Sequence, residues 1–208
     1  MKGLFVVFEG IDGSGKGTIL RHAYDFLVAK GIKKENLILT AEPTPGFYGK
    51  KVRELLSTDV DPKVNAMQFL DLYVADRKEH IEKVLKPAID SGKIILCDRY
   101  KYSTFTYQQI QGIPIEKISV LHKSMVVPNL VFILDVPADV ALKRISSDSK
   151  RNTKEVFEKK DFLENVREGF LKSKKIFPNE NIVIVDSSKS IEKVSAEING
   201  VLWKILKK

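Results

Sequence analysis

The residues most suited to chemistry form a glycine-rich stretch near the start of the chain. Gly10 and Gly15-Lys16 stand at the spacing Gly-x-x-x-x-Gly-Lys, between an apolar run and a segment with helical patterning. In this context backbone N–H groups converge on a polyphosphate, the helix N-terminus adds positive potential, and the lysine adds a point charge. The sequence therefore predicts a phosphate-binding loop, with binding residues Gly10, Asp12, Gly13, Ser14, Gly15, Lys16, Gly17 and Thr18.

The loop departs from the usual pattern at one position. Gly17 stands where a serine or threonine normally reaches Mg²⁺, and Thr18 follows one place later. Thr18 is therefore a candidate metal ligand whose geometry is in question. The alternative, a strand-to-helix turn that only packs tightly, accounts less well for the lysine.

Composition limits the class of protein. The chain has 208 residues, of which 43% are hydrophobic and 30% charged, as expected for one globular domain spanning residues 1–208. No apolar run approaches the roughly 20 residues that span a membrane, and the N-terminal run is too short for a signal peptide. We expect a cytoplasmic protein without a membrane partner.

The single cysteine, Cys97, lies in an apolar run and is expected to be a buried thiol.

The net charge of +8 favours an anionic partner, either nucleotide phosphates or a nucleic acid. Much of the excess lies in the segment 143–175, where lysines and arginines outnumber acids. A nucleic-acid-binding ATPase is one hypothesis, but no tyrosine or tryptophan that would stack bases is interleaved with these charges. We expect no nucleic-acid partner, and most other lysines are interpreted as a solvated surface.

Short apolar runs rich in β-branched residues alternate with helical patterns, which predicts a parallel sheet buried on both faces by helices. The predicted strands are 4–8, 37–39, 94–97, 130–134 and 182–185. Ligands of such sheets lie beyond the carboxyl ends of the strands. The candidate site is therefore formed by 10–18, Glu42-Pro43, Asp98-Arg99-Tyr100 and Asp135.

Asp98 and Arg99, directly after the third predicted strand, are the residues that indicate most about the chemistry of the site. Arg99 needs an anion at this buried edge, and its planar fork suits a phosphate. Asp98 stands where an acid holds Mg²⁺, often through water, in enzymes with a phosphate-binding loop. The alternative is that both residues only pair with other charges.

Helical patterning covers residues 15–30 and 62–91, and a further helix begins near Ser103. Tyr73 and Arg77 are one turn apart on the long helix and could present a ring and a guanidinium to one ligand. Spacing alone equally suits a core tyrosine beside a surface arginine. Thr104 and Tyr107 follow the third strand closely.

Taken in order, the motifs resemble thymidylate kinase: Phe8-Glu9-Gly10-Ile11-Asp12-Gly13-Ser14-Gly15-Lys16, Glu42-Pro43, Leu72-Tyr73-Val74-Ala75-Asp76-Arg77, Asp98-Arg99-Tyr100, Ser103-Thr104, Tyr107 and 134–139. The resemblance implies a five-stranded P-loop NTPase-type fold and transfer of the γ-phosphoryl of ATP to dTMP, with Mg²⁺ bridging phosphates. It implies Lys16, Arg99 and Arg151 as catalytic residues. The implied dTMP-binding residues are Asp12, Glu42, Tyr73, Arg77, Arg99, Ser103, Thr104 and Tyr107.

More specific roles come with this resemblance. It implies that Asp12 contacts the acceptor sugar, Arg99 the acceptor phosphate, and Arg77 the base, on which Tyr73 stacks. It also implies that Tyr107 walls off the sugar. A homodimer is expected, and its contacts could use residues that equally suit the core, namely Met67, Phe69 and Trp203.

Two departures from the family shape further expectations. Ala41 stands where many bacterial relatives have an arginine, so Arg53 is a candidate replacement. The loop positions Gly13-Ser14 lack the arginine found in some relatives, which predicts a cation from a mobile lid at about 144–160, with Arg151 preferred over Arg144, Lys150 and Lys154. A solvated basic loop is the alternative.

Other kinases remain as alternatives. Gly15-Lys16-Gly17-Thr18 is similar to adenylate kinase, but Asp98-Arg99-Tyr100 is not. A deoxynucleoside kinase needs a carboxylate base for a 5′-hydroxyl, and Glu42 could supply one.

Overall fold

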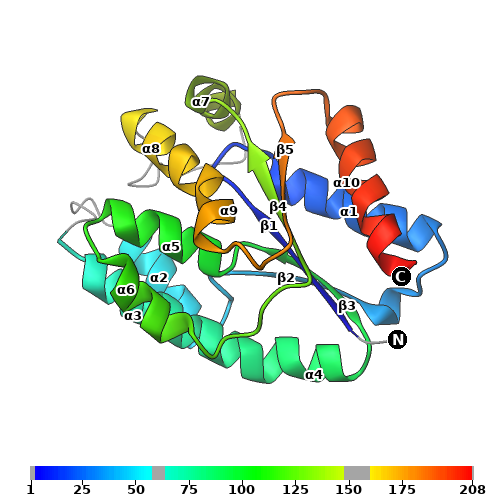
Figure 1. Ribbon diagram of the computed structural model, residues 1–208, viewed down its shortest axis with the longest axis horizontal. Helices are drawn as coiled ribbons and strands as arrows, with labels where there is room; N and C mark the ends of the chain where they lie inside the picture. The colour runs from blue at the N-terminus through cyan, green and yellow to red at the C-terminus, as the bar shows by residue number, and fades with distance from the viewer. Residues whose placement is uncertain (1–2, 58–63, 148–159, 208) are drawn as a thin grey trace.

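The computed structural model describes residues 3–57, 64–147 and 160–207, which are built around a five-stranded sheet (Figure 1). Every strand pair is parallel and the strand order is β2-β3-β1-β4-β5. The predicted α/β class with a five-stranded parallel sheet is therefore confirmed. The strands are β1 (Leu4–Glu9), β2 (Leu37–Ala41), β3 (Ile94–Asp98), β4 (Leu130–Asp135) and β5 (Ile182–Asp186).

Four of these strands extend one residue beyond their apolar runs and end on an acid: Glu9, Asp98, Asp135 and Asp186. Backbone pairing continues past the last apolar residue, since Phe8 still pairs with Asp98 and Asp135 with Asp186. The sheet therefore carries a row of carboxyl groups at the edge where parallel α/β sheets bind their ligands.

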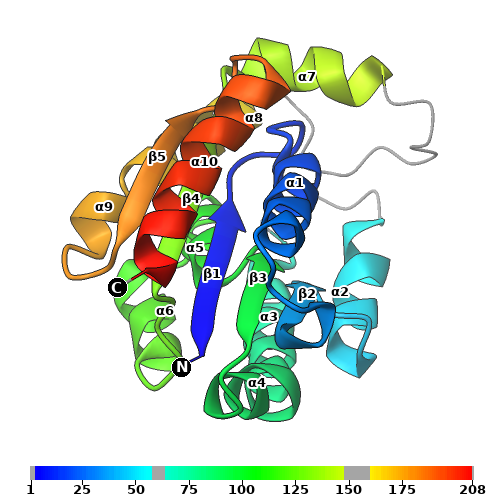
Figure 2. The same ribbon diagram turned by 90° about the vertical axis from the view of Figure 1, so that its right-hand side faces the viewer.

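Helices cover both faces of the sheet (Figure 2). Side chains of β1 alternate between two cores: Phe5 and Val7 join one, while Val6 and Phe8 join the other. The second core is covered by α1 (Lys16–Ala29) and α10 (Ile191–Leu206), which lie together in front of the sheet in Figure 2. Burial on both faces explains why the strands read as continuous apolar runs.

The opposite face is covered mainly by α3 (Ala66–His80), α5 (Lys101–Ile110) and α8 (Lys160–Leu171). The remaining helical elements are η1 (Lys34–Asn36), α2 (Phe47–Leu56), η2 (Ile81–Leu85), α4 (Lys86–Asp90), α6 (Ile115–His122), α7 (Ala138–Ser147) and α9 (Ser173–Ile176). No helix among the described residues is long and apolar enough to cross a membrane.

The predicted long helix is present but is not one regular α-helix. Helix α3 continues through η2, a π-helical turn, into α4. The π turn lies immediately before Lys86-Pro87, and proline has no N–H for the α-helical bond to the preceding turn. Its position beside Pro87 therefore accounts for the irregularity, which apolar periodicity did not reveal.

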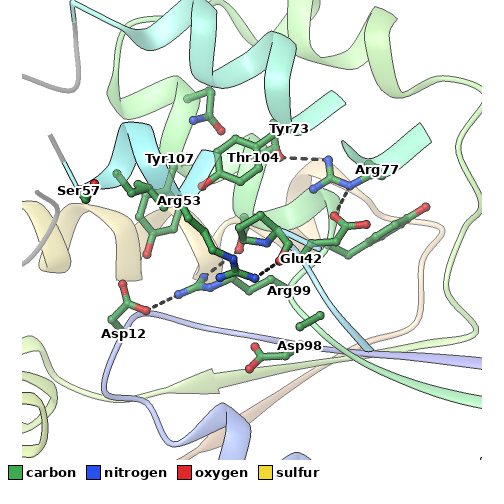
Figure 3. A pocket seen from close by; sticks show the side chains of 16 residues that line it. Asp12, Glu42, Arg53, Ser57, Tyr73, Arg77, Asp98, Arg99, Thr104 and Tyr107 are labelled. Atoms are coloured by element: carbon green, nitrogen blue, oxygen red, sulfur yellow. Dashed lines mark hydrogen bonds and ion pairs between the residues drawn. The ribbon is translucent and has the colours of Figure 1, made fainter. Parts of the chain in front are cut away.

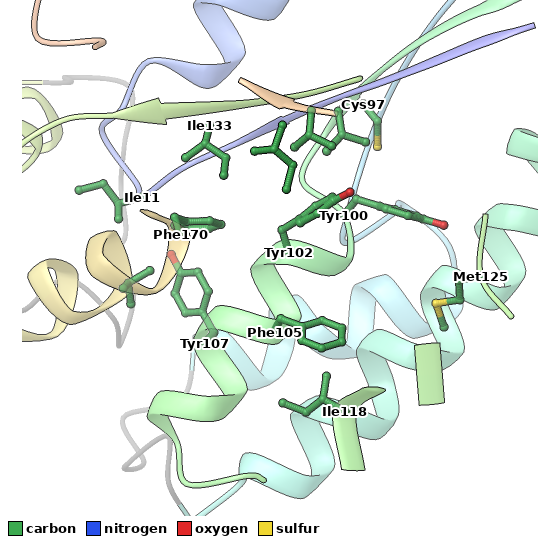
Figure 4. Close-up of a cluster of buried hydrophobic side chains, with 14 of the residues drawn as sticks. Ile11, Cys97, Tyr100, Tyr102, Phe105, Tyr107, Ile118, Met125, Ile133 and Phe170 are labelled. Atoms are coloured by element: carbon green, nitrogen blue, oxygen red, sulfur yellow. The ribbon is translucent and has the colours of Figure 1, made fainter. Parts of the chain in front are cut away.

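A cluster of aromatic side chains packs beneath β3 (Figure 4). Tyr100 and Phe105 project from the start of α5 into this core, and the rings of Phe5 and Tyr100 meet edge to face at 5.1 Å. Cys97 is buried among them, and burial raises the pKa of its thiol well above the ordinary value. The expectation of a buried core thiol is confirmed.

Candidate active site

The glycine-rich loop joins the central strand β1 to α1. Gly10, Gly13 and Gly15 all have positive φ, and a Cβ on Gly13 would lie 2.4 Å from the carbonyl oxygen of Ala141. Only glycine can occupy that position without moving α7. No side chain caps the N-terminus of α1. The first N–H groups of the helix therefore face the loop, an arrangement that binds anions.

Lys16 lies inside the curve of this loop. Its Nζ donates to the carbonyl oxygens of Gly10 and Ile11, at 3.0 and 2.9 Å. Burial lowers the pKa of Lys16 to about 8; Arg99 also lowers it, while Asp98, Asp12 and Glu9 raise it. A buried ammonium near neutral pKa gains charge stabilisation from a bound polyphosphate.

The two candidate metal ligands do not line the same cavity. Asp98 lines the first cavity described below, whereas Thr18 lines the second. Oδ1 of Asp98 is buried and has no hydrogen-bond partner among the described residues. A Cβ on Gly17 would lie 3.9 Å from Asp98 Oδ2, so position 17 is next to this acid. Gly17 leaves that space to another oxygen ligand or to water.

A first cavity of about 430 Å³ opens beside the loop, at the carboxyl ends of β1, β2 and β3 (Figure 3). That volume suits a small ligand. All eight predicted dTMP-binding residues line it. Arg53 and Ala41 line it as well, and Arg53 Nη2 donates to the carbonyl oxygen of Pro43.

Arg99 occupies the loop side of the first cavity and has a φ of 68°, which is unusual for a residue other than glycine. Its guanidinium donates to Asp12 Oδ1 at 2.6 Å, to Ser103 Oγ at 2.9 Å and to the carbonyl oxygen of Gly10 at 3.1 Å (Figure 3). The strand-end prediction that Asp12 and Arg99 face one crevice therefore matches their placement, and Ser103 lies with them. Asp135, predicted at the same crevice, does not line this cavity and instead pairs with Arg167 at 2.6 Å.

Glu9 is a site residue that sequence reasoning did not single out. Its buried carboxyl accepts hydrogen bonds from the backbone N–H groups of Tyr100 and Ser103 and from Ser103 Oγ. Burial raises the pKa of Glu9 to about 7, although Arg99, Ser103 and Tyr100 lower it. Glu9 thus fastens the end of β1 to the start of α5, immediately after Arg99.

Arg77 occupies the far side of the first cavity and is 1% exposed, so the surface-arginine alternative is wrong. Its Nε donates to Glu42 Oε2 at 2.7 Å and its Nη1 donates to Thr104 Oγ1 at 3.1 Å (Figure 3). Glu42 also accepts from His80 Nδ1 at 2.9 Å. With both oxygens engaged, Glu42 is poorly suited to remove a proton from a substrate hydroxyl.

Gln108 is a second residue that sequence reasoning missed. It is fully buried on α5, lines the first cavity, and its Oε1 has no hydrogen-bond partner among the described residues. Its Nε2 donates to Gln111 Oε1 at 3.1 Å, which fixes the orientation of the amide. A buried acceptor without a partner costs roughly 1–3 kcal/mol, and a ligand N–H would recover that cost.

A second cavity of about 630 Å³ lies on the other side of the loop. It is bounded by the loop residues Gly13 to Gly15, by Arg144 on α7, and by the segment 187–192, which runs from the end of β5 into the first residues of α10. Arg144 Nη2 donates to the carbonyl oxygen of Ser187 at 3.0 Å and so joins two of these walls. The end of β5 was absent from the sequence-based site, although the same strand-end rule applies to it.

The central strand, the glycine loop and Lys16 at the start of α1 define a P-loop nucleotide-binding fold. Arg151 and most of the predicted lid at about 144–160, including Lys150 and Lys154, lie outside the described residues.

Comparison with known proteins narrows this class to one family. A family model described as thymidylate kinase matches residues 8–198. The chain is 42% identical to a thymidylate kinase of Brachyspira hyodysenteriae, with 95% of this chain and 92% of the relative covered. It is 37% identical to a probable thymidylate kinase of Thermococcus gammatolerans, with 96% of each covered. The chain belongs to the thymidylate kinase family.

Proposed function

We propose that this protein transfers the γ-phosphoryl group of ATP to dTMP, giving ADP and dTDP for dTTP synthesis. The observation that carries the proposal is the pair of cavities on either side of the phosphate-binding loop. Two nucleotides bound there would bring their phosphates together at the loop. We assign dTMP to the first cavity and ATP to the second.

Recognition of thymine is explained by the polar atoms of the first cavity. Thymine offers a carbonyl acceptor at position 4 and an N–H donor at position 3. Arg77 supplies the donor for the first, and the buried Oε1 of Gln108 supplies an acceptor for the second. The ring of Tyr73 stacks on the base. Cytosine reverses both polarities, so it leaves buried groups unpaired.

The chemistry is direct in-line transfer. An oxygen of the dTMP phosphate forms a bond to the γ-phosphorus while the bond from that phosphorus to the β-γ bridging oxygen breaks, and ADP leaves. Arg99 binds and orients the acceptor phosphate, Asp12 orients Arg99 and contacts the sugar, and Tyr107 walls the sugar off. Loop N–H groups and Lys16 hold the donor phosphates and stabilise the developing charge.

The site also suits Mg²⁺. The buried, unpartnered Oδ1 of Asp98 is a hard oxygen ligand beside the loop, and Thr18 is the nearby hydroxyl of the motif. Bound Mg²⁺ would neutralise charge on the β- and γ-phosphates. Thr18 and Asp98 line different cavities, so we do not place both in direct contact with one ion. We assign the ion mainly to Asp98, with water between the carboxylate and the ion.

The wider proposal is a single nucleoside monophosphate kinase domain spanning 1–208 in the cytoplasm. A mobile lid at about 144–160 supplies Arg151 to the transferring phosphoryl group. We also propose a homodimer. Phe69 is buried within the chain and Trp203 packs on Phe26, whereas Met67 remains 39% exposed at the start of α3. A Met67→Glu variant should therefore show a smaller mass than wild type by light scattering.

A monophosphate panel tests the proposed reaction. Protein, ATP and Mg²⁺ should convert dTMP much faster than AMP, CMP or GMP. Equal turnover of AMP would contradict the proposal. Faster turnover of thymidine than of dTMP would favour a deoxynucleoside kinase, and hydrolysis of ATP stimulated by single-stranded DNA would favour the nucleic-acid-binding ATPase.

A further inference from the structure

His122 lies at the end of α6, 6% exposed, directly behind Arg77. Its Nε2 is 2.7 Å from Arg77 Nη1, and its Nδ1 is 2.7 Å from the carbonyl oxygen of Ile118. The ring of Phe105 packs edge to face against the imidazole at 5.3 Å. The imidazole is therefore held in one orientation by two hydrogen bonds and by the ring of Phe105.

These contacts define the protonation state of His122. A carbonyl oxygen can only accept, so Nδ1 carries the proton. A guanidinium can only donate, so Nε2 must present its lone pair to Arg77. Burial lowers the pKa of His122 to about 3, and the positive charges of Arg77, Lys101 and Lys78 contribute. The neutral tautomer with the proton on Nδ1 is the one that satisfies both neighbours.

The partners of Arg77 can be counted in the same way. A guanidinium has five N–H groups. Nε donates to Glu42, and the two hydrogens of Nη1 are directed to Thr104 and His122. Among the described residues no hydrogen bond reaches Nη2, while Arg77 lines the first cavity. Nη2 is therefore the edge left for a ligand.

We propose that His122 is a positioning residue for base recognition: by accepting a hydrogen bond from Nη1, it turns the Nη2 edge of Arg77 towards the exocyclic oxygen at position 4 of the pyrimidine. The inference rests on the proposed function and assigns a role to a residue outside the cavity wall. Without His122, one hydrogen of Nη1 loses its acceptor and the guanidinium is held by Glu42 and Thr104 alone, so both affinity for dTMP and rejection of a 4-amino base decrease.

Three variants test this role. His122→Leu removes the acceptor and keeps an apolar side chain. His122→Gln keeps an acceptor oxygen. His22→Leu changes an exposed histidine on α1 and serves as the control. For each we would measure KM for dTMP and for ATP, kcat, the dTMP over dCMP ratio of kcat/KM, direct dTMP binding by calorimetry, and the melting temperature.

We expect His122→Leu to raise KM for dTMP about tenfold, equivalent to about 1.4 kcal/mol, with KM for ATP within about twofold of wild type. Its dTMP over dCMP ratio should fall, and His122→Gln should recover most of both losses. Unchanged dTMP binding and selectivity in a folded His122→Leu variant, or equal losses for Leu and Gln, would overturn the inference. If wild type itself fails to phosphorylate dTMP, the proposed function fails instead.

Discussion

The two cavities flanking the phosphate-binding loop are built in different ways. The first is walled by buried charged side chains that hold one another, such as Glu42 and Arg77. The second is walled by loop glycines and by the segment 187–192, whose Lys189 and Ile191 are exposed. Specific recognition in the first cavity thus depends on individual side chains, whereas binding in the second depends more on backbone. Substitutions should therefore distinguish binding in the first cavity from binding in the second.

The largest effect is expected where the cavities meet. Lys16→Met removes the ammonium held by the phosphate-binding loop, so kcat should fall by about 10²- to 10³-fold, the loss expected for removing one preorganised charge donor. Steady-state kinetics with each substrate varied would measure it. A loss confined to KM for ATP would show that Lys16 only binds the donor.

A change at Arg77 should affect the first cavity alone. Arg77→Met should raise KM for dTMP by one to two orders of magnitude and leave KM for ATP unchanged. It also leaves the buried carboxylate of Glu42 without its cationic partner, so the free energy of unfolding should fall by about 3–5 kcal/mol.

The double variant Arg77→Met with Glu42→Gln provides the control, measured by urea unfolding. Removing the unpaired charge of Glu42 should restore part of the stability but none of the dTMP affinity. An equal rise in both KM values would contradict the separation of the cavities.

Glu9 predicts a pH dependence of stability. Its pKa is raised to about 7 by burial, so between pH 4.5 and 7 the unfolded chain loses this proton while the folded chain keeps it. The free energy of unfolding should therefore decrease as pH rises through this window, by on the order of 3 kcal/mol from this group.

Glu9→Gln should abolish that part of the slope, measured by urea unfolding at pH 5 and pH 8. Asp186, beside the second cavity, has a pKa lowered by hydrogen bonds from Ser188, so its contribution has the opposite sign and is lost as pH falls. Parallel slopes for wild type and Glu9→Gln would contradict the assignment.

The smallest effect is expected on the wall of the second cavity. Lys189 is exposed and lies 3.8 Å from both Asp186 and Glu197, so its charge is shared and screened. Lys189→Ala should raise KM for ATP by less than about threefold and leave KM for dTMP unchanged. A tenfold rise would show that the second cavity also depends on a single side chain.

Much of the architecture could be predicted because buried parallel strands produce an unmistakable pattern of apolar runs. The strand ends also placed Asp12, Asp98 and Arg99 at one crevice. The order of strands in the sheet and the pairing of the second cavity with the end of β5 could not be predicted, since both depend on how helices cross the sheet.

The residues that escaped sequence reasoning share one property. Glu9 and His122 are polar side chains whose partners Ser103 and Arg77 lie 94 and 45 positions away in the chain, and Gln108 is a buried amide whose free oxygen is seen only in the folded protein. Spacing along one helix detects neighbours such as Tyr73 and Arg77 but cannot detect such pairs. Isolated histidines in particular gave no local signal.

The π turn η2 has a consequence for how the long helix is read. A π turn holds one residue more than an α turn, so everything after it is rotated by roughly 100° relative to a continuous α-helix. The apolar residues of this stretch recur at the α-helical spacing both before and after η2. Because the backbone after η2 is rotated, the apolar residues of α4 face a different direction from those of α3. Before the turn α3 packs on α5 and α6 beside the first cavity; after it α4 packs on β3. One local change of phase lets a single helix serve two surfaces.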